Sequence, residues 1–220
     1  MTPIHELVRP YDPSEIIADG IVHGVGVVAA LIAVTVLIFY ATVWGSSGAL
    51  AASWIYGIGL VTSLGISFAY NIWPRSPVKW VLRRLDHSAI FILIAATYTP
   101  FLAAALPDPL VAANLIGIWG VAAFGIVLKC RWPGRFDKLT ILLYLAMGWS
   151  GVMLYSRLHD VLSLATLALI VIGGLIYTTG VVFHLWERLR FNTAIWHGFV
   201  VTAAGVHYAA VLTCVIAFPT

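Results

Sequence analysis

Charged side chains are scarce in this chain. Lys, Arg, Asp and Glu make up 10% of its 220 residues, whereas hydrophobic residues make up 61% and the mean hydropathy is +0.98. Such a composition excludes an ordinary water-soluble domain. In place of charge, the sequence has apolar runs of about 20 residues, each long enough to cross the hydrocarbon core of a bilayer as a helix. The chain is therefore expected to be an integral membrane protein.

Cysteine is also rare, and internal repeats and low-complexity stretches are missing. The two cysteines are Cys130 and Cys214, and the helices predicted below put them in opposite halves of the membrane, too far apart for a disulfide. Residues 1–220 are expected to form a single seven-helix domain. The residues before the first apolar run, His5 to Glu15, are mixed or acidic rather than basic, which argues against a cleavable signal peptide.

Seven apolar runs, separated by charged or proline-containing breaks, indicate seven transmembrane helices. Lipid offers no hydrogen-bond partner to the backbone, so each run must be a helix or a barrel strand, and continuous apolarity without alternation excludes the barrel. The predicted fold class is an all-α membrane protein with a seven-helix bundle. The predicted helices are Ile17–Trp44, Leu50–Trp73, Ser88–Leu106, Leu110–Lys129, Leu139–Ser156, Val161–Trp186 and Ala194–Phe218.

The basic residues predict the orientation of this bundle, because Lys and Arg near helix ends are retained on the cytoplasmic side. Every Lys and Arg except Arg157 lies on one side of the predicted bundle. Arg9 precedes the first helix, and the others lie at the connections after the second, fourth and sixth helices. The N terminus is therefore expected in the cytoplasm and the C terminus outside. This topology also explains the net charge of +3, so no nucleic-acid partner is expected.

Three short polar clusters interrupt the apolar sequence, and the predicted topology brings all of them to the cytoplasmic ends of helices. Buried polar groups without partners would cost on the order of several kcal/mol each, so these side chains are expected to bond to one another, to water or to an ion. They form a predicted pocket. Its residues are Ser67 and Asn71 on the second helix, Asp86 and His87 on the third, and Thr193 and His197 on the seventh.

At these residues the chain resembles the hemolysin III family, bacterial members of the progestin and adipoQ receptor superfamily, which is related to the alkaline ceramidases. The segments that carry the likeness are Leu85–Ile90, Ala96–Phe101, Tyr144–Trp149 and Ala194–Val200, together with Glu15–Ala18 and His23–Gly24. The resemblance implies seven helices with the N terminus inside, a place in the bacterial inner (plasma) membrane, and an association with cytolysis. It further implies membrane lipids, and a lipid-like small molecule, as partners.

The resemblance also implies a zinc site. Its members have Ser-x-x-x-His on the second helix, Asp at the start of the third and His-x-x-x-His on the seventh; the three histidines hold zinc, and the aspartate contacts the metal-bound water. Ser67, Asp86 and His197 match this pattern, whereas Asn71 and Thr193 replace two ligand histidines. An amide and a hydroxyl are poor zinc donors. The two substitutions therefore predict that this site binds no zinc.

The interpretation favoured by the sequence is a hemolysin III-like membrane protein whose pocket binds a ligand or regulates the membrane without hydrolysis. One alternative is a zinc-dependent hydrolase of lipid amides, in which Ser67 and Asp86 are catalytic and the ligands are rewired. His197 would remain a ligand, and His184, at the end of the sixth helix, would replace a missing one. Asp86 and His87 would complete this set.

A second alternative is the movement of protons or ions. Ionisable residues within the apolar runs would form its path, because such groups are costly unless they are paired or functional. Asp19 is the most costly of them, and the sequence does not identify its partner. The residues of this path are Asp19, His23, Asp86, His197 and His207.

Overall fold

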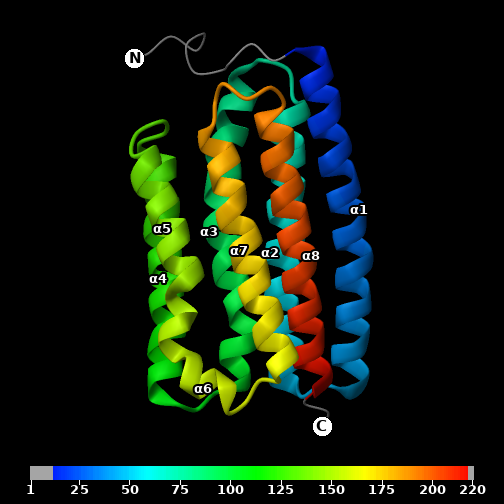
Figure 1. Ribbon diagram of the computed structural model, residues 1–220, viewed down its shortest axis with the longest axis vertical. Helices are drawn as coiled ribbons and strands as arrows, with labels where there is room; N and C mark the ends of the chain where they lie inside the picture. Colours follow the sequence, from blue (N-terminus) through cyan, green and yellow to red (C-terminus); the bar gives the residue numbers. More distant parts are fainter. Residues whose placement is uncertain (1–11, 218–220) are drawn as a thin grey trace.

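The computed structural model describes residues 12–217 as a bundle of long helices that run up and down in alternation (Figure 1). Three residues used in the predictions above, His5, Arg9 and Phe218, lie outside the described residues. The elements are α1 (Pro13–Trp44), α2 (Ser47–Ile72), α3 (Pro77–Ala104), α4 (Pro109–Arg131), α5 (Asp137–Trp149), the 3-10 turn η2 (Ser150–Leu154), α6 (Tyr155–His159), α7 (Leu164–Leu185) and α8 (Asn192–Ala217).

Seven segments of the described chain are long and apolar enough to cross a membrane. Six of them are single helices. The remaining one, Asp137–His159, is fifth in chain order and consists of α5, η2 and α6. The outer faces of the bundle expose large apolar side chains such as Val25 and Ile116, as expected of helices that face lipid on one side and each other on the other. The prediction of an all-helical bundle with seven membrane spans is confirmed.

The third helix begins at Pro77 rather than at the predicted Ser88. Ser76 caps it by accepting a hydrogen bond from the backbone N–H of Lys79, and Pro77 takes a first-turn position, where its missing N–H costs nothing. The pattern of apolar residues did not reveal this start, because the added turns carry basic side chains. Arg83 and its basic neighbours therefore lie on a helix and not in a loop.

The fifth membrane span departs from α-helical geometry at η2. Tyr98 reaches across from α3, and its hydroxyl donates to the carbonyl of Gly148 at 2.6 Å and accepts from the N–H of Gly151 at 3.0 Å. These bonds satisfy backbone groups where the helical pattern changes. The predicted continuous helix Leu139–Ser156 missed this change, since it depends on a side chain fifty positions earlier in the chain.

α3 is the most enclosed helix. Within its apolar stretch of 18 residues, 61% is buried, against 17–44% for the corresponding stretches of the other spans. α2, α4, α5 and α8 all contact it. α1 lies at one edge of the bundle and packs on α2 and α8, while α4 and α5 form the opposite edge (Figure 1). α1, α3 and α8 begin at one end of the bundle, and α2 ends there. This end collects the polar residues considered below.

Gly125 is a position where α4 approaches α3 too closely for a side chain. A Cβ atom there would overlap the ring of Phe91, which is fully buried. We expect Gly125→Val to destabilise the protein by about 1–3 kcal/mol, because the Phe91 ring has no room to move without disturbing its neighbours. The thermal midpoint in detergent measures this. Gly117→Val on the same helix is the matched control, since its Cβ would meet nothing within 4 Å, and an equal loss in both variants would refute the packing argument.

Candidate functional site

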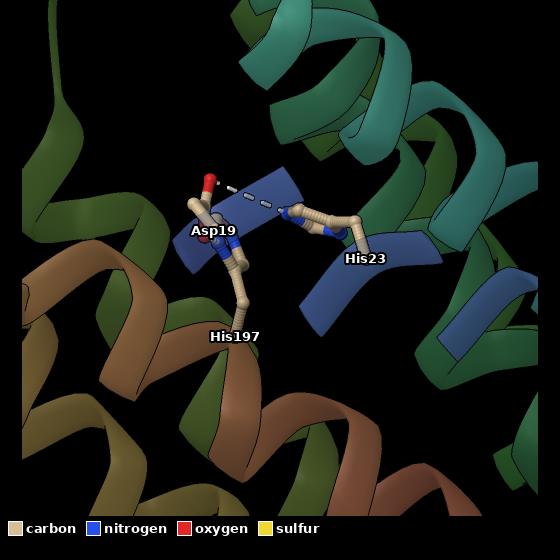
Figure 2. Close-up of side chains that lie close together, drawn as sticks. All are labelled: Asp19, His23 and His197. Atoms are coloured by element: carbon tan, nitrogen blue, oxygen red, sulfur yellow. Dashed lines mark hydrogen bonds and ion pairs between the residues drawn. The ribbon is translucent and has the colours of Figure 1, made fainter. Parts of the chain in front are cut away.

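Three ligand-type side chains from two helices meet inside the bundle (Figure 2). Asp19 and His23 come from α1 and His197 from α8, and their exposed fractions are 4%, 1% and 7%. Oδ1 of Asp19 lies 2.7 Å from Nδ1 of His197, and Oδ2 lies 3.7 Å from Nε2 of His23. The two imidazole rings are 4.1 Å apart, centre to centre. We call these three residues the Asp-His-His cluster.

Contacts at the start of α1 determine how that helix lies along α8. Asp12 and Glu15 form a capping box that begins α1, and Glu15 also accepts a hydrogen bond at 2.9 Å from the backbone N–H of Phe191, which precedes α8. Glu15, Asp19 and His23 follow one another at intervals of four residues, so they share one face of the helix. Glu15 contacts Phe191 just before α8, so Asp19 and His23, one and two turns further along the same face of α1, lie against the first turns of α8.

Asn71 on α2 closes the cluster from the side. Its Nδ2 donates to the carbonyl oxygen of Ser67 at 2.9 Å and lies 3.2 Å from Nε2 of His23. The Ser67 carbonyl fixes Nδ2 as a donor, so Nε2 of His23 accepts and the proton of that ring sits on Nδ1. Nδ1 is buried and has no partner among the described residues. The cluster thus does not satisfy all of its own polar atoms, which is unusual in a protein interior.

Asp86 on α3 lies beside the cluster without being part of it. Its carboxyl group is hydrogen-bonded by the side chain of Ser67 and lies close enough to His197 and Asp19 for their charges to interact. The group of side chains whose ligand atoms all lie within 4.8 Å of one another comprises Asp19, His23 and His197. Asp86 is therefore a neighbour of the cluster and not one of its members.

The cluster fits a metal ion by its chemistry. Two imidazoles and one carboxylate are a donor set found in catalytic zinc sites, where three protein ligands leave a fourth position open. Zinc–ligand distances of about 2.0–2.2 Å put the donors of one tetrahedral ion roughly 3–4 Å apart, and one ligand atom from each of the three residues lies within 4.8 Å of the others. Binding through Nε2 of His23 would also require that atom to give up its contact with Asn71. The residues present could thus hold a divalent metal.

Comparison with known proteins identifies the chain's relatives. A family model described as Haemolysin-III related matches residues 15–208. The chain belongs to the hemolysin III family. Hemolysin-3 of Bacillus cereus is 37% identical over 202 residues, which are 92% of each chain. The Hemolysin-3 homolog of Bacillus subtilis (strain 168) is 35% identical over 205 residues, 93% of this chain and 96% of the relative.

A human relative is also recognisable. The monocyte to macrophage differentiation factor of Homo sapiens is 34% identical over 174 residues, 76% of this chain and 72% of the relative. The family assignment made from the residues is confirmed, and with it the assignment as a multi-pass membrane protein of the hemolysin III family.

The structure of this hemolysin III family member brings some of the predicted pocket residues to the cluster. Thr193 and Asn71 line a small, solvent-open pocket that also touches Asp19. Ser67 and Asp86 lie beside it, as described above. Asn71 and Thr193, at the positions where the resemblance predicts ligand histidines, therefore border the site. Asp19 and His23, which the sequence interpretation did not assign to the metal, occupy the place next to them.

Other predicted ligands lie elsewhere. His184 is exposed, and its ring lies 5.2 Å from that of Trp196, centre to centre. His87 points to the opposite side of α3, where it lines a second pocket. Among the described residues, the group able to hold a metal contains neither of these histidines. The rewired set of Asp86, His87, His184 and His197 is thus not assembled in this structure.

His207, the last residue of the suggested ion path, is separated from the cluster. It lies ten positions after His197 on α8, about 15 Å along the helix. Its Nε2 lies 3.1 Å from the backbone carbonyl of Ile170, and its ring packs on Gly173 of α7. The structure therefore gives His207 a partner that does not belong to the cluster.

Proposed function

We propose that this hemolysin III family protein is a metal-dependent hydrolase of lipid amide bonds whose metal is held by Asp19, His23 and His197. The observation that supports it is the convergence of these three buried side chains next to Asp86. The sequence alone predicted a site with too few ligands; helix α1 supplies the missing ones. Zinc is the expected metal, since its catalytic sites accept two histidines and a carboxylate.

A divalent metal at this place would act as a Lewis acid and make a water molecule nucleophilic near neutral pH. The protein's own groups would do the rest. Asp86, oriented by the Ser67 side chain, would accept a proton from a water molecule as the oxygen of that water attacks the amide carbonyl carbon. Asp86 then gives this proton to the nitrogen when the carbon–nitrogen bond breaks, so that a carboxylic acid and an amine leave.

Two neighbouring residues would position the substrate. Asn71 and Thr193 line the pocket that opens beside Asp19, and their amide and hydroxyl groups can hydrogen-bond to the polar part of a lipid amide. Glu15 and Asn192 line this pocket together with Thr193, so it lies at the bundle end where α1 and α8 begin. We assign this end to the cytoplasmic face of a bacterial cell membrane, because the Lys- and Arg-rich connections lie there. A membrane lipid would enter from that side.

A second function is favoured by one specific contact. The hydrogen bond of 2.7 Å between Asp19 and His197 gives both groups a partner without a metal. In this case the pocket would bind a lipid-like ligand without hydrolysing it, and the replacement of two family histidines by Asn71 and Thr193 would mark the loss of zinc chemistry. The two functions differ in whether a metal is bound.

Metal content tests the proposal directly. The protein is purified in detergent, washed with a mild chelator, and analysed by mass spectrometry for bound metals. We expect one zinc per chain in the wild type and at least a tenfold loss in His197→Ala, which removes one of three ligands. His184→Ala is the matched control and should keep its metal, because His184 is exposed and outside the cluster. A wild-type protein free of metal would support the non-hydrolytic pocket instead.

A further inference from the structure

A second pocket lies on the other side of α3, between α3, α4 and the turn that follows α4. It is small and open to solvent. None of the residues of the Asp-His-His cluster lines this second pocket, so the pocket is a separate feature of the molecule. Its lining residues are Trp80, Arg83, Arg84, His87, Lys129, Pro133 and Gly134.

The charge of this pocket is one-sided. Arg83, Arg84 and Lys129 line it, and no acidic side chain does. Asp137, at the start of α5, pairs with the buried Lys129 and neutralises that charge. Neither arginine forms an ion pair with a carboxylate among residues 12–217, although Asp86 and Asp137 are near enough for their charges to act on Arg83. The residues that line the pocket itself therefore carry more positive than negative charge.

Arg84 is held in a fixed orientation. Its guanidinium carbon lies 3.5 Å from the centre of the Trp80 ring, the distance of a face-on stack, which occupies the flat face of the group and leaves its edge free. Nε of Arg84 is buried and has no hydrogen-bond partner among the described residues. A buried donor without an acceptor is costly, and more so when it is charged. Arg84 therefore lines the pocket with an oriented guanidinium group whose buried Nε has no acceptor among the described residues.

We propose that this pocket binds the phosphate group of an anionic lipid. Arginine matches phosphate through two parallel N–H···O bonds, and a second arginine beside it supplies further charge. Basic pockets between transmembrane helices at the cytoplasmic side recognise such head groups, and Trp80 is a residue type that prefers the membrane interface. The site does not depend on the metal proposal.

Lipid titrations test this site. The full protein in a neutral detergent is titrated with a short-chain phosphatidylglycerol, with the phosphatidylcholine of equal chain length, and with inorganic phosphate, while the thermal midpoint is followed. We expect the midpoint to rise more with phosphatidylglycerol than with phosphatidylcholine, because both carry the same phosphodiester but the two arginines repel the choline cation of the latter. Arg84→Gln should weaken this response at least tenfold in concentration. Arg135→Gln, which removes an exposed charge just outside the pocket, should leave it unchanged.

The possible outcomes separate the explanations. Equal weakening in Arg84→Gln and Arg135→Gln would indicate diffuse surface charge and overturn the site. A response to inorganic phosphate alone would assign the pocket to the free ion and overturn the lipid assignment. If Arg84→Gln fails to fold, Arg83→Gln replaces it with the same expectation, because Arg83 lines the same pocket without stacking on Trp80.

Discussion

Asp86→Asn is expected to lower the hydrolysis of a ceramide-like amide at least about 100-fold while leaving the bound metal in place. General acid–base catalysis contributes about 10²- to 10⁴-fold, and an amide cannot accept the proton that a carboxylate accepts. The asparagine keeps the size of the side chain and an oxygen that can accept the hydrogen bond from Ser67. The change therefore removes the chemistry of Asp86 with little change of shape.

Turnover of a fluorogenic lipid amide in detergent micelles, measured together with zinc content on the same sample, tests this prediction. Asp160→Asn is the matched control, since Asp160 is exposed and lies after α6, at the other end of the bundle from the cluster. It should retain full activity. Loss of zinc together with activity in Asp86→Asn would make Asp86 a ligand, and unchanged turnover would exclude it as the base.

The fold could be predicted from the sequence to the extent that it depends on apolar length. Seven runs long enough to span a bilayer became seven spans. The start of α3 at Pro77 was missed because its first turns are basic, and η2 was missed because Tyr98, fifty residues away, forms the bonds that stabilise it. The sequence-based prediction of helix boundaries was thus wrong where a capping residue or a distant side chain, and not hydropathy, determines the local structure.

The candidate site was predictable only in part. His197 was recognised from its family position, and Asp19 stood out as a costly carboxylate in an apolar run. Their pairing was not predictable, since it depends on the register of α1 against α8, which the contact between Glu15 and Phe191 determines. One signal was present: Asp19 and His23 have the same spacing of four residues as Ser67 and Asn71. This spacing puts both members of each pair on one helix face.

The other large effect is expected from Asp19→Ala. Removing the carboxylate leaves two imidazoles, 4.1 Å apart, as the remaining ligands of the cluster, and two ligands are fewer than catalytic zinc sites use. We expect zinc content to fall at least about tenfold and hydrolysis to fall with it. The thermal midpoint should also decrease, because Asp19 is the hydrogen-bond partner of buried His197 and its loss leaves that ring unpaired.

The conservative variant Asp19→Glu decides whether this loss reports a ligand or only a structural role. A glutamate keeps the charge and the donor atoms but moves them by one methylene, so Asp19→Glu should bind more zinc than Asp19→Ala. If Asp19 had only a structural role, the glutamate side chain would be too long for its contact, and Asp19→Glu would bind no more zinc than Asp19→Ala. Metal retained in Asp19→Ala but lost in His197→Ala would mean that Asp86, not Asp19, completes the site. In that case α1 would supply only His23 to the metal, with Asp86 and His197 as the other two ligands.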